Sequence, residues 1–251
     1  MARNRSDKDR RGGIAIQTGA LGGLKAVVFD LDSTLCTYAL SVAEVLHAAV
    51  RRVGVDPSRF GDFAELAERY ADLWTEVQPG FDSAEEIRLH IVEQLLAERG
   101  VNDPSLAQPL SDAYGAVRGE TGIRPFDGAI ELLRDLKLHY TLGLLTNGPS
   151  DMQWEKIRSL RIETTFDAIV VAGDVGIYKP DVRVFRILLD RLDVTADSTL
   201  FVGDNYEMDI VGADAAGMKT AWIRTNGARP TGDVLPDVEV AEATVLREVL
   251  L

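Results

Sequence analysis

The sequence predicts an α/β protein built on a doubly wound, parallel, Rossmann-like sheet with an inserted all-helical domain. Three observations predict this class. Residues 24–29 form a short apolar run rich in β-branched side chains, which is typical of a buried parallel strand. Residues 38–122 carry only helical patterns, and strand and helix patterns alternate after them. The first strand is therefore separated from the rest of its sheet by a helical block.

The segment before the first strand is rich in basic residues, which are Arg3, Arg5, Lys8, Arg10 and Arg11. No apolar stretch of the kind found in secretory signals follows them. We therefore expect residues 1–22 to form a flexible, solvated N-terminal tail.

The helical block contains four stretches with apolar residues at helical spacing: 38–53, 60–77, 84–99 and 106–118. Clusters of glycine and proline separate them. A loop that follows a parallel strand tolerates insertions, and it opens onto the ligand-binding edge of the sheet. We therefore assign residues 37–121 to an inserted helical domain.

After the helical block, four helices alternate with strands. The helices are expected at residues 127–138, 152–160, 181–192 and 210–217, and the strands at 141–145, 168–172, 199–202 and 220–223. A weaker strand is expected near 238–240, before a closing helix. Together with residues 23–36, residues 122–251 would form the α/β core.

The composition excludes several functional classes. The formal net charge of −13 disfavours nucleic acid and anionic membrane surfaces as partners. No apolar run approaches the roughly 20 residues of a membrane helix. Cys36 is the only cysteine, so an intrachain disulfide is impossible, and a reducing, cytoplasmic setting is expected. The sequence leaves open whether the chain is a monomer or a homodimer.

Polar residues gather where the expected strands end, which is where ligands bind in open α/β sheets. They are Asp30 and Asp32 after the first strand, Thr146 and Asn147 after the second, Lys179 beyond the third, and Asp204 and Asp209 after the fourth. Clustered carboxylates repel one another and an anionic substrate, and Mg²⁺ relieves that repulsion. A lysine can neutralise phosphoryl oxygens, and a second carboxylate can give a proton to a leaving alkoxide. The set therefore indicates phosphoryl transfer.

These residues form four ordered groups: Asp30-x-Asp32-x-Thr34, Thr146-Asn147, Lys179-Pro180 and Gly203-Asp204-x4-Asp209. The groups resemble the four motifs of the haloacid dehalogenase-like (HAD) superfamily. The resemblance covers nearly the whole chain after residue 23, and the helical insertion resembles the C1-type cap of that family.

The resemblance implies a role for each residue. Asp30 would be the nucleophile that forms an aspartyl-phosphate. Asp32 would protonate the leaving group, then activate water, and its backbone carbonyl would bind Mg²⁺. Thr146, Asn147 and Lys179 would hold the phosphoryl group, and Lys179 would also orient Asp30. Asp30 and Asp204 would be carboxylate ligands of the metal, and Asp209 would bind it through water or support the other ligands.

Asp32 narrows the reaction within the family. The dehalogenases of the family lack this second acid, because a halide leaves without a proton. Its presence therefore favours phosphate esters. Ser33 stands where the family usually has glycine, and Asn205 where it often has serine or threonine. Neither change removes a charged group, so we expect activity to survive both.

The sequence thus predicts a Mg²⁺-dependent hydrolase, a phosphatase that cleaves a small phosphorylated metabolite through a phospho-aspartate. Two alternatives remain: a phosphomutase or phosphotransferase of the same superfamily, and a non-catalytic regulator that binds phosphate. A response-regulator receiver is excluded by chain order, because its phospho-acceptor lies on the third strand.

Overall fold

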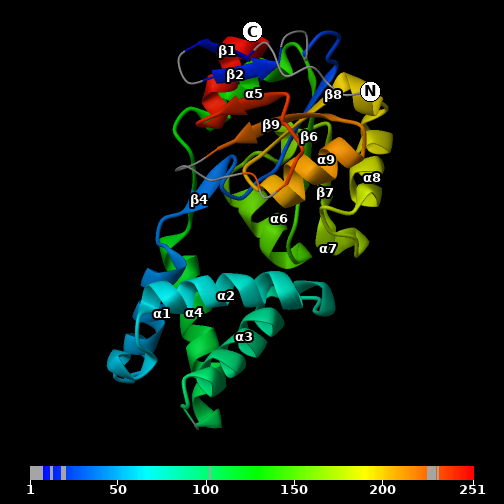
Figure 1. The fold of residues 1–251 in the computed structure, drawn as a ribbon. Helices are drawn as coiled ribbons and strands as arrows, with labels where there is room; N and C mark the ends of the chain where they lie inside the picture. Colours follow the sequence, from blue (N-terminus) through cyan, green and yellow to red (C-terminus); the bar gives the residue numbers. More distant parts are fainter. Residues whose placement is uncertain (1–7, 12–13, 18–20, 102, 225–229, 231) are drawn as a thin grey trace. The chain divides into compact units, whose positions relative to one another are not determined.

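The computed structural model describes residues 8–11, 14–17, 21–101, 103–224, 230 and 232–251 (Figure 1). The chain forms two compact units. Unit 1 consists of Met1–Thr37, Pro125–Asn147 and Ile157–Leu251, and unit 2 of Tyr38–Arg124 and Gly148–Lys156. None of the described helices is both long enough and apolar enough to cross a membrane.

Unit 1 is built on an eight-stranded sheet with the order β1-β2-β10-β9-β8-β3-β6-β7. Six strands are parallel: β3 (Ala26–Phe29), β6 (Thr141–Thr146), β7 (Ala168–Val171), β8 (Thr199–Gly203), β9 (Lys219–Ile223) and β10 (Val238–Val240). The chain leaves the central strand β3 toward β6 and later returns to its other side with β8. This reversal of strand order confirms the predicted doubly wound sheet and marks the edge where ligands bind.

Helices cover both faces of this sheet. On one face, α8 (Val182–Leu192) and α9 (Gly212–Ala215) pack over a core that includes Val28, Leu145 and Phe201. Gly143 of β6 lets α8 approach closely, because a Cβ there would lie 2.8 Å from a methyl carbon of Leu192. The opposite face is covered by α5 (Ala129–Lys137), which contacts β6 and the C-terminal helix α10 (Arg247–Leu250). All four residues of β3 are buried, which explains their apolar character.

The other helical segments after β6 are one helix of ten residues and several shorter pieces. They are α6 (Ser150–Ser159), α7 (Ala172–Val175), and the turns η4 (Glu163–Thr165), η5 (Ala196–Ser198), η6 (Tyr206–Val211) and η7 (Ala243–Leu246). The turn η6, which follows β8, is a wide π-helical turn. It bears on function because it carries Asp209.

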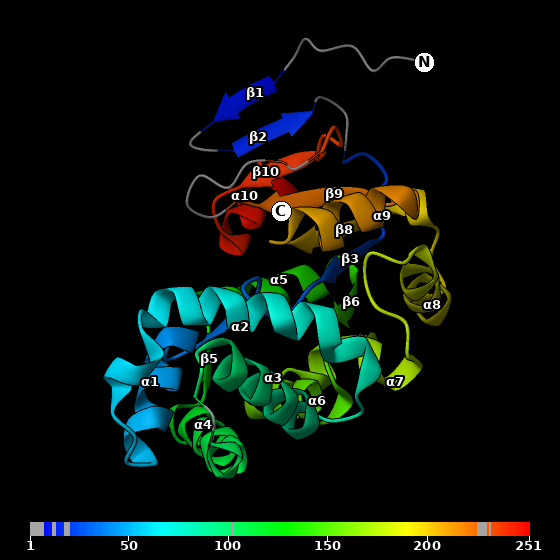
Figure 2. The same ribbon diagram turned by 60° about the horizontal axis from the view of Figure 1, so that its bottom comes forward.

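The N-terminal segment differs from the tail that the sequence suggested. Strands β1 (Lys8–Arg11) and β2 (Ile14–Gln17) pair antiparallel with each other, and β2 pairs with β10 (Figure 2). The edge of β10 offers unpaired backbone groups, and β2 satisfies them. The other residues expected in the tail before residue 21 lie outside the described residues.

Unit 2 is a bundle of four helices: α1 (Val42–Arg52), α2 (Phe63–Val77), α3 (Ala84–Glu98) and α4 (Ala107–Thr121). Three 3₁₀ turns, η1 (Pro57–Phe60), η2 (Gln78–Gly80) and η3 (Pro104–Leu106), join them. Side-chain caps fix three helix starts, at Ser41, Asp62 and Ser83. The short strands β4 (Cys36–Tyr38) and β5 (Ile123–Pro125) pair where the chain enters and leaves the bundle.

Candidate active site

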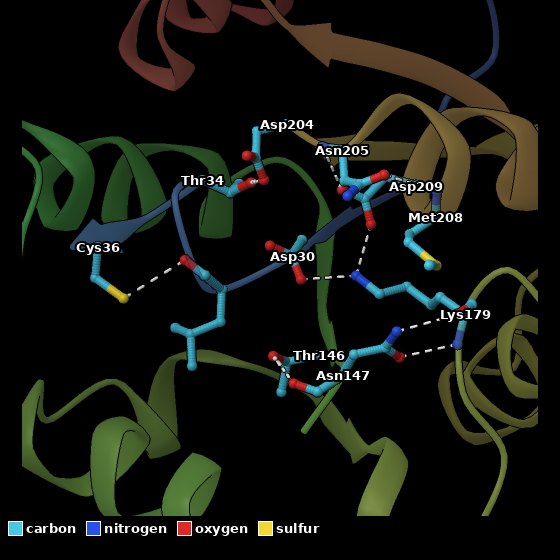
Figure 3. Close-up of polar contacts among 11 residues, drawn as sticks. Asp30, Thr34, Cys36, Thr146, Asn147, Lys179, Asp204, Asn205, Met208 and Asp209 are labelled. Atoms are coloured by element: carbon cyan, nitrogen blue, oxygen red, sulfur yellow. Dashed lines mark hydrogen bonds and ion pairs between the residues drawn. The ribbon is translucent and has the colours of Figure 1, made fainter. Parts of the chain in front are cut away.

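The sheet brings three strand ends to one edge of unit 1. Phe29, the last residue of β3, aligns with Leu144 of β6 on one side and Val202 of β8 on the other. Asp30 directly follows β3, Thr146 ends β6, and Asp204 directly follows β8. These residues therefore lie at the same edge, and the close-up in Figure 3 shows their side chains around Asp30.

Lys179 joins two of the carboxylates at this edge. Its Nζ donates to Oδ1 of Asp30 at 2.7 Å and to Oδ1 of Asp209 at 2.6 Å. The lysine side chain is only 3% exposed. Burial alone would lower the pKa of Lys179, but the charges of Asp209 and Asp30 outweigh burial and raise the pKa. The lysine is therefore a fixed, buried cation at physiological pH.

Asp209 is held by two donors and by the shape of the chain. Its Oδ1 accepts from Lys179, and its Oδ2 accepts from the backbone N–H of Asn205 at 3.0 Å. It packs against Gly203, where an added Cβ would collide with the carboxylate of Asp209. The side chain of Asn205 accepts from the N–H of Met208 at 3.0 Å and thereby caps the turn that carries Asp209. Asn205 thus supplies the capping oxygen that serine or threonine would supply there.

Asn147 holds the backbone of Lys179. Its Nδ2 donates to the carbonyl oxygen of Lys179 at 3.0 Å, and its Oδ1 accepts from the N–H of Lys179 at 2.8 Å. We expected Asn147 to bind phosphate. That stays a prediction, in which its backbone N–H would donate to a phosphoryl oxygen. The clamp on Lys179 is an additional contact that spacing does not reveal, because the two residues are 32 positions apart.

The loop after β3 carries Asp32 and Thr34. The hydroxyl of Thr34 donates to Oδ1 of Asp204 over a long 3.4 Å, and Asp32 is half-buried. Between them Ser33 has a φ of 61°, in the left-handed region that favours glycine. The backbone conformation therefore explains why a glycine is usual at this position. The expectation that the carbonyl of Asp32 binds metal stays a prediction.

The residues present fit a divalent cation. Carboxylate oxygens of Asp30, Asp204 and Asp209 lie within 4.8 Å of one another. Burial, and then the charge of Asp209, raises the pKa of Asp204 to about 7. Burial also raises the pKa of Asp30 although Lys179 opposes it. A divalent cation between these carboxylates would compensate their charge and lower both pKa values. Because both oxygens of Asp209 already accept hydrogen bonds, Asp30 and Asp204 are the better ligands.

Comparisons with known proteins identify the family. The model of the haloacid dehalogenase-like hydrolases matches residues 24–217. A phosphoserine phosphatase of Thermus thermophilus is 30% identical over an alignment 255 positions long, and the alignment covers 91% of this chain and 98% of that protein. A glyceraldehyde 3-phosphate phosphatase of Methanothermobacter thermautotrophicus is 30% identical over 218 residues, covering 80% and 86%.

Solved structures show the same architecture. The crystal structure of a 2-haloacid dehalogenase from Pseudomonas syringae superposes with a TM-score of 0.64 at 30% identity, covering 90% of this chain and 98% of the other. The HAD-hydrolase YfnB of Bacillus subtilis shares the fold with a TM-score of 0.72 at 24% identity, covering 90% and 98%. The chain belongs to the haloacid dehalogenase-like hydrolases, and phosphatases and a dehalogenase are both among its relatives.

Proposed function

We propose that this protein is a Mg²⁺-dependent phosphatase that hydrolyses a small phosphate monoester through an aspartyl-phosphate on Asp30. The observation that carries the proposal is the carboxylate cluster of Asp30, Asp204 and Asp209. The ammonium of Lys179 forms ion pairs with two of these carboxylates, those of Asp30 and Asp209. Three carboxylates and one lysine suit a site that also takes a divalent cation and a phosphoryl group.

The first half of the proposed reaction forms the phospho-enzyme. A carboxylate oxygen of Asp30 attacks phosphorus, and the bond from phosphorus to the ester oxygen breaks. Asp32 gives its proton to the leaving alkoxide. Lys179 lies against Asp30, so it holds the nucleophile in place and neutralises a phosphoryl oxygen, and Thr146 and the N–H of Asn147 donate to the others. Bound Mg²⁺ would supply further positive charge to the phosphoryl oxygens.

The second half restores the enzyme. Asp32, now a carboxylate, takes a proton from water, and the water oxygen attacks phosphorus. The bond between phosphorus and the Asp30 oxygen breaks, and inorganic phosphate leaves. Asp32 lies two residues after Asp30 in the same loop, so one acid serves both halves. A halide needs no such acid, and Asp32 therefore favours phosphate esters.

The names of two relatives indicate which substrates to test first. Phosphoserine and glyceraldehyde 3-phosphate are both small phosphate esters. We expect phosphate release from p-nitrophenyl phosphate and from a panel of such metabolites, with Mg²⁺ and not after chelation, and no halide release from 2-chloropropionate. Halide release without phosphate release, or no turnover by folded protein with any divalent metal, would contradict the proposal.

A further inference from the structure

The side chain of Trp222 in β9 contacts Asp204, the residue that directly follows the neighbouring strand β8. Trp222 of β9 aligns with Gly203, the last residue of β8. The indole N–H of Trp222 donates to the backbone carbonyl oxygen of Asp204 at 2.9 Å. The tryptophan is 1% exposed and Asp204 is half-buried, so the donor end of this hydrogen bond is shielded from water. A buried donor that loses its acceptor is costly, so the bond fixes the two residues relative to each other.

The indole ring is itself held by neighbours. Tyr206 packs edge-on against it, with ring centroids 5.4 Å apart, and the Tyr206 hydroxyl donates to the carbonyl oxygen of Val234 at 2.7 Å. The guanidinium of Arg224 lies 5.5 Å from the ring centroid and pairs with Glu239 at 2.7 Å. The N–H of Trp222 therefore has a fixed direction, and Asp204 must stay where that N–H points.

Asp204 needs such an anchor more than Asp209 does. The carboxylate of Asp209 is fixed by Lys179 and by the N–H of Asn205, at 2.6 and 3.0 Å. The Asp204 carboxylate receives a longer bond, 3.4 Å from the Thr34 hydroxyl, and the residue is half-buried. Its position therefore depends on its backbone, which Trp222 holds.

We propose that Trp222 is a positioning residue for Asp204. Its indole N–H holds the Asp204 backbone so that the carboxylate stays near those of Asp30 and Asp209, and this sets the affinity for a divalent cation. The inference rests on the proposed function, because it takes Asp204 to be a cation ligand. Partners that orient ligands in this way typically change metal affinity about 10–100-fold when they are removed.

The test is calorimetric titration of Mg²⁺ into substrate-free Trp222→Phe, with Tyr206→Phe as the matched control. The first variant keeps an aromatic ring but loses the donor to Asp204. The second keeps the ring that packs against Trp222 and loses only the hydrogen bond to Val234, which does not reach Asp204. We expect the Mg²⁺ Kd of Trp222→Phe to rise about 10-fold and that of Tyr206→Phe to change less than about twofold.

Three outcomes overturn the inference. A wild-type Kd in folded Trp222→Phe would show that the N–H does not position the ligand. Equal weakening in both variants would show a general effect of packing. Absence of Mg²⁺ binding by the wild-type protein would refute the proposed function as well as the inference, whereas the first two outcomes would refute the inference alone. Should Trp222→Phe not fold, the indole of Trp222 is replaced by benzothiophene, which keeps its shape but has no N–H. We expect the same rise in the Mg²⁺ Kd for this variant, and a wild-type Kd would overturn the inference.

Discussion

The loops after β8 and β6 both bring polar side chains to the edge where Asp30 lies, but they do so by different means. The loop after β8 buries a charge: Asp209 is 1% exposed, packs against Gly203 and pairs with Lys179. The loop after β6 uses a neutral amide, because Asn147 holds the backbone of the same lysine through two hydrogen bonds. One loop therefore fixes the charged end of Lys179 and the other fixes its main chain.

This difference predicts how well each of the two loops tolerates amino-acid substitution. A buried ion pair is sensitive to small displacements, since breaking it leaves an uncompensated charge. A pair of neutral hydrogen bonds contributes less, and water can replace part of it. Variants of the loop after β8 should therefore be more severe than variants of the loop after β6.

Lys179→Met removes the ammonium that the loop after β8 holds, and should have the largest effect. Asp30 and Asp209 would then be buried without their cation, so we expect kcat to fall about 1,000-fold and the free energy of unfolding in metal-free buffer to fall by about 3–5 kcal/mol. Steady-state kinetics and urea denaturation measure the two effects. The control is Lys137→Met, which breaks a partly exposed ion pair with Asp167 and should cost under about 1 kcal/mol. Equal losses in the two variants would contradict the account.

Gly203→Ala tests the charged loop by packing alone. The new Cβ would collide with the Asp209 carboxylate, so that carboxylate must move away from Lys179. We expect kcat to fall about 100-fold, because displacements of about 1 Å at a catalytic group have effects of this size. Gly119→Ala is the matched control, since nothing lies within 4 Å of an added Cβ in that helix. Wild-type kinetics in Gly203→Ala would show that the placement of Asp209 is unimportant.

Asn147→Ala tests the neutral loop. It removes both hydrogen bonds to the Lys179 backbone while Asp209 and Asp30 still hold the ammonium. We expect kcat to fall about 10-fold and the free energy of unfolding to fall by about 1–3 kcal/mol. The Kd for Mg²⁺, measured by calorimetry, should stay within about twofold of wild type because the proposed ligands Asp30 and Asp204 follow β3 and β8. A larger loss of kcat than in Gly203→Ala would contradict the expectation that the loop after β8 is the more sensitive of the two.

Ser33→Gly should have the smallest effect. The left-handed φ of Ser33 costs a residue with a Cβ roughly 1–2 kcal/mol, and the greater freedom of unfolded glycine offsets about 0.4–1 kcal/mol of that gain. We expect a rise of up to about 1 kcal/mol in the free energy of unfolding, with kcat unchanged. Urea denaturation measures the rise, and a clear loss of stability would show that the serine hydroxyl makes a compensating contact.

The sequence predicted the strand ends well, because a polar residue closes each apolar run: Asp30 and Asp204 directly follow β3 and β8, and Thr146 is the last residue of β6. Asp30, Thr146 and Asp204 could be placed at one edge from this pattern together with the alternation of strands and helices. The order of the four motifs then indicated the family, and the match to residues 24–217 confirms it.

Other contacts could not be read from the sequence, because they depend on how distant segments meet. Asn147 reaches Lys179 across 32 positions and Trp222 reaches Asp204 across 18, and neither separation corresponds to a repeat of a helix or strand. The pairing of β2 with β10 likewise depends on an edge that exists only in the folded sheet. For Asp209 the order of the motifs indicated a place beside the metal ligands but not the ion pair with Lys179.

The most direct test of the central claim is chemical identification of the phosphorylated residue. Enzyme mixed with Mg²⁺ and substrate is quenched in acid, and borohydride reduction then converts an aspartyl-phosphate to homoserine. We predict homoserine at Asp30, detected by mass spectrometry of the peptide, in samples with substrate and in none without it. Steady turnover with no homoserine, or with homoserine at a different aspartate, would contradict the assignment of Asp30 as the nucleophile.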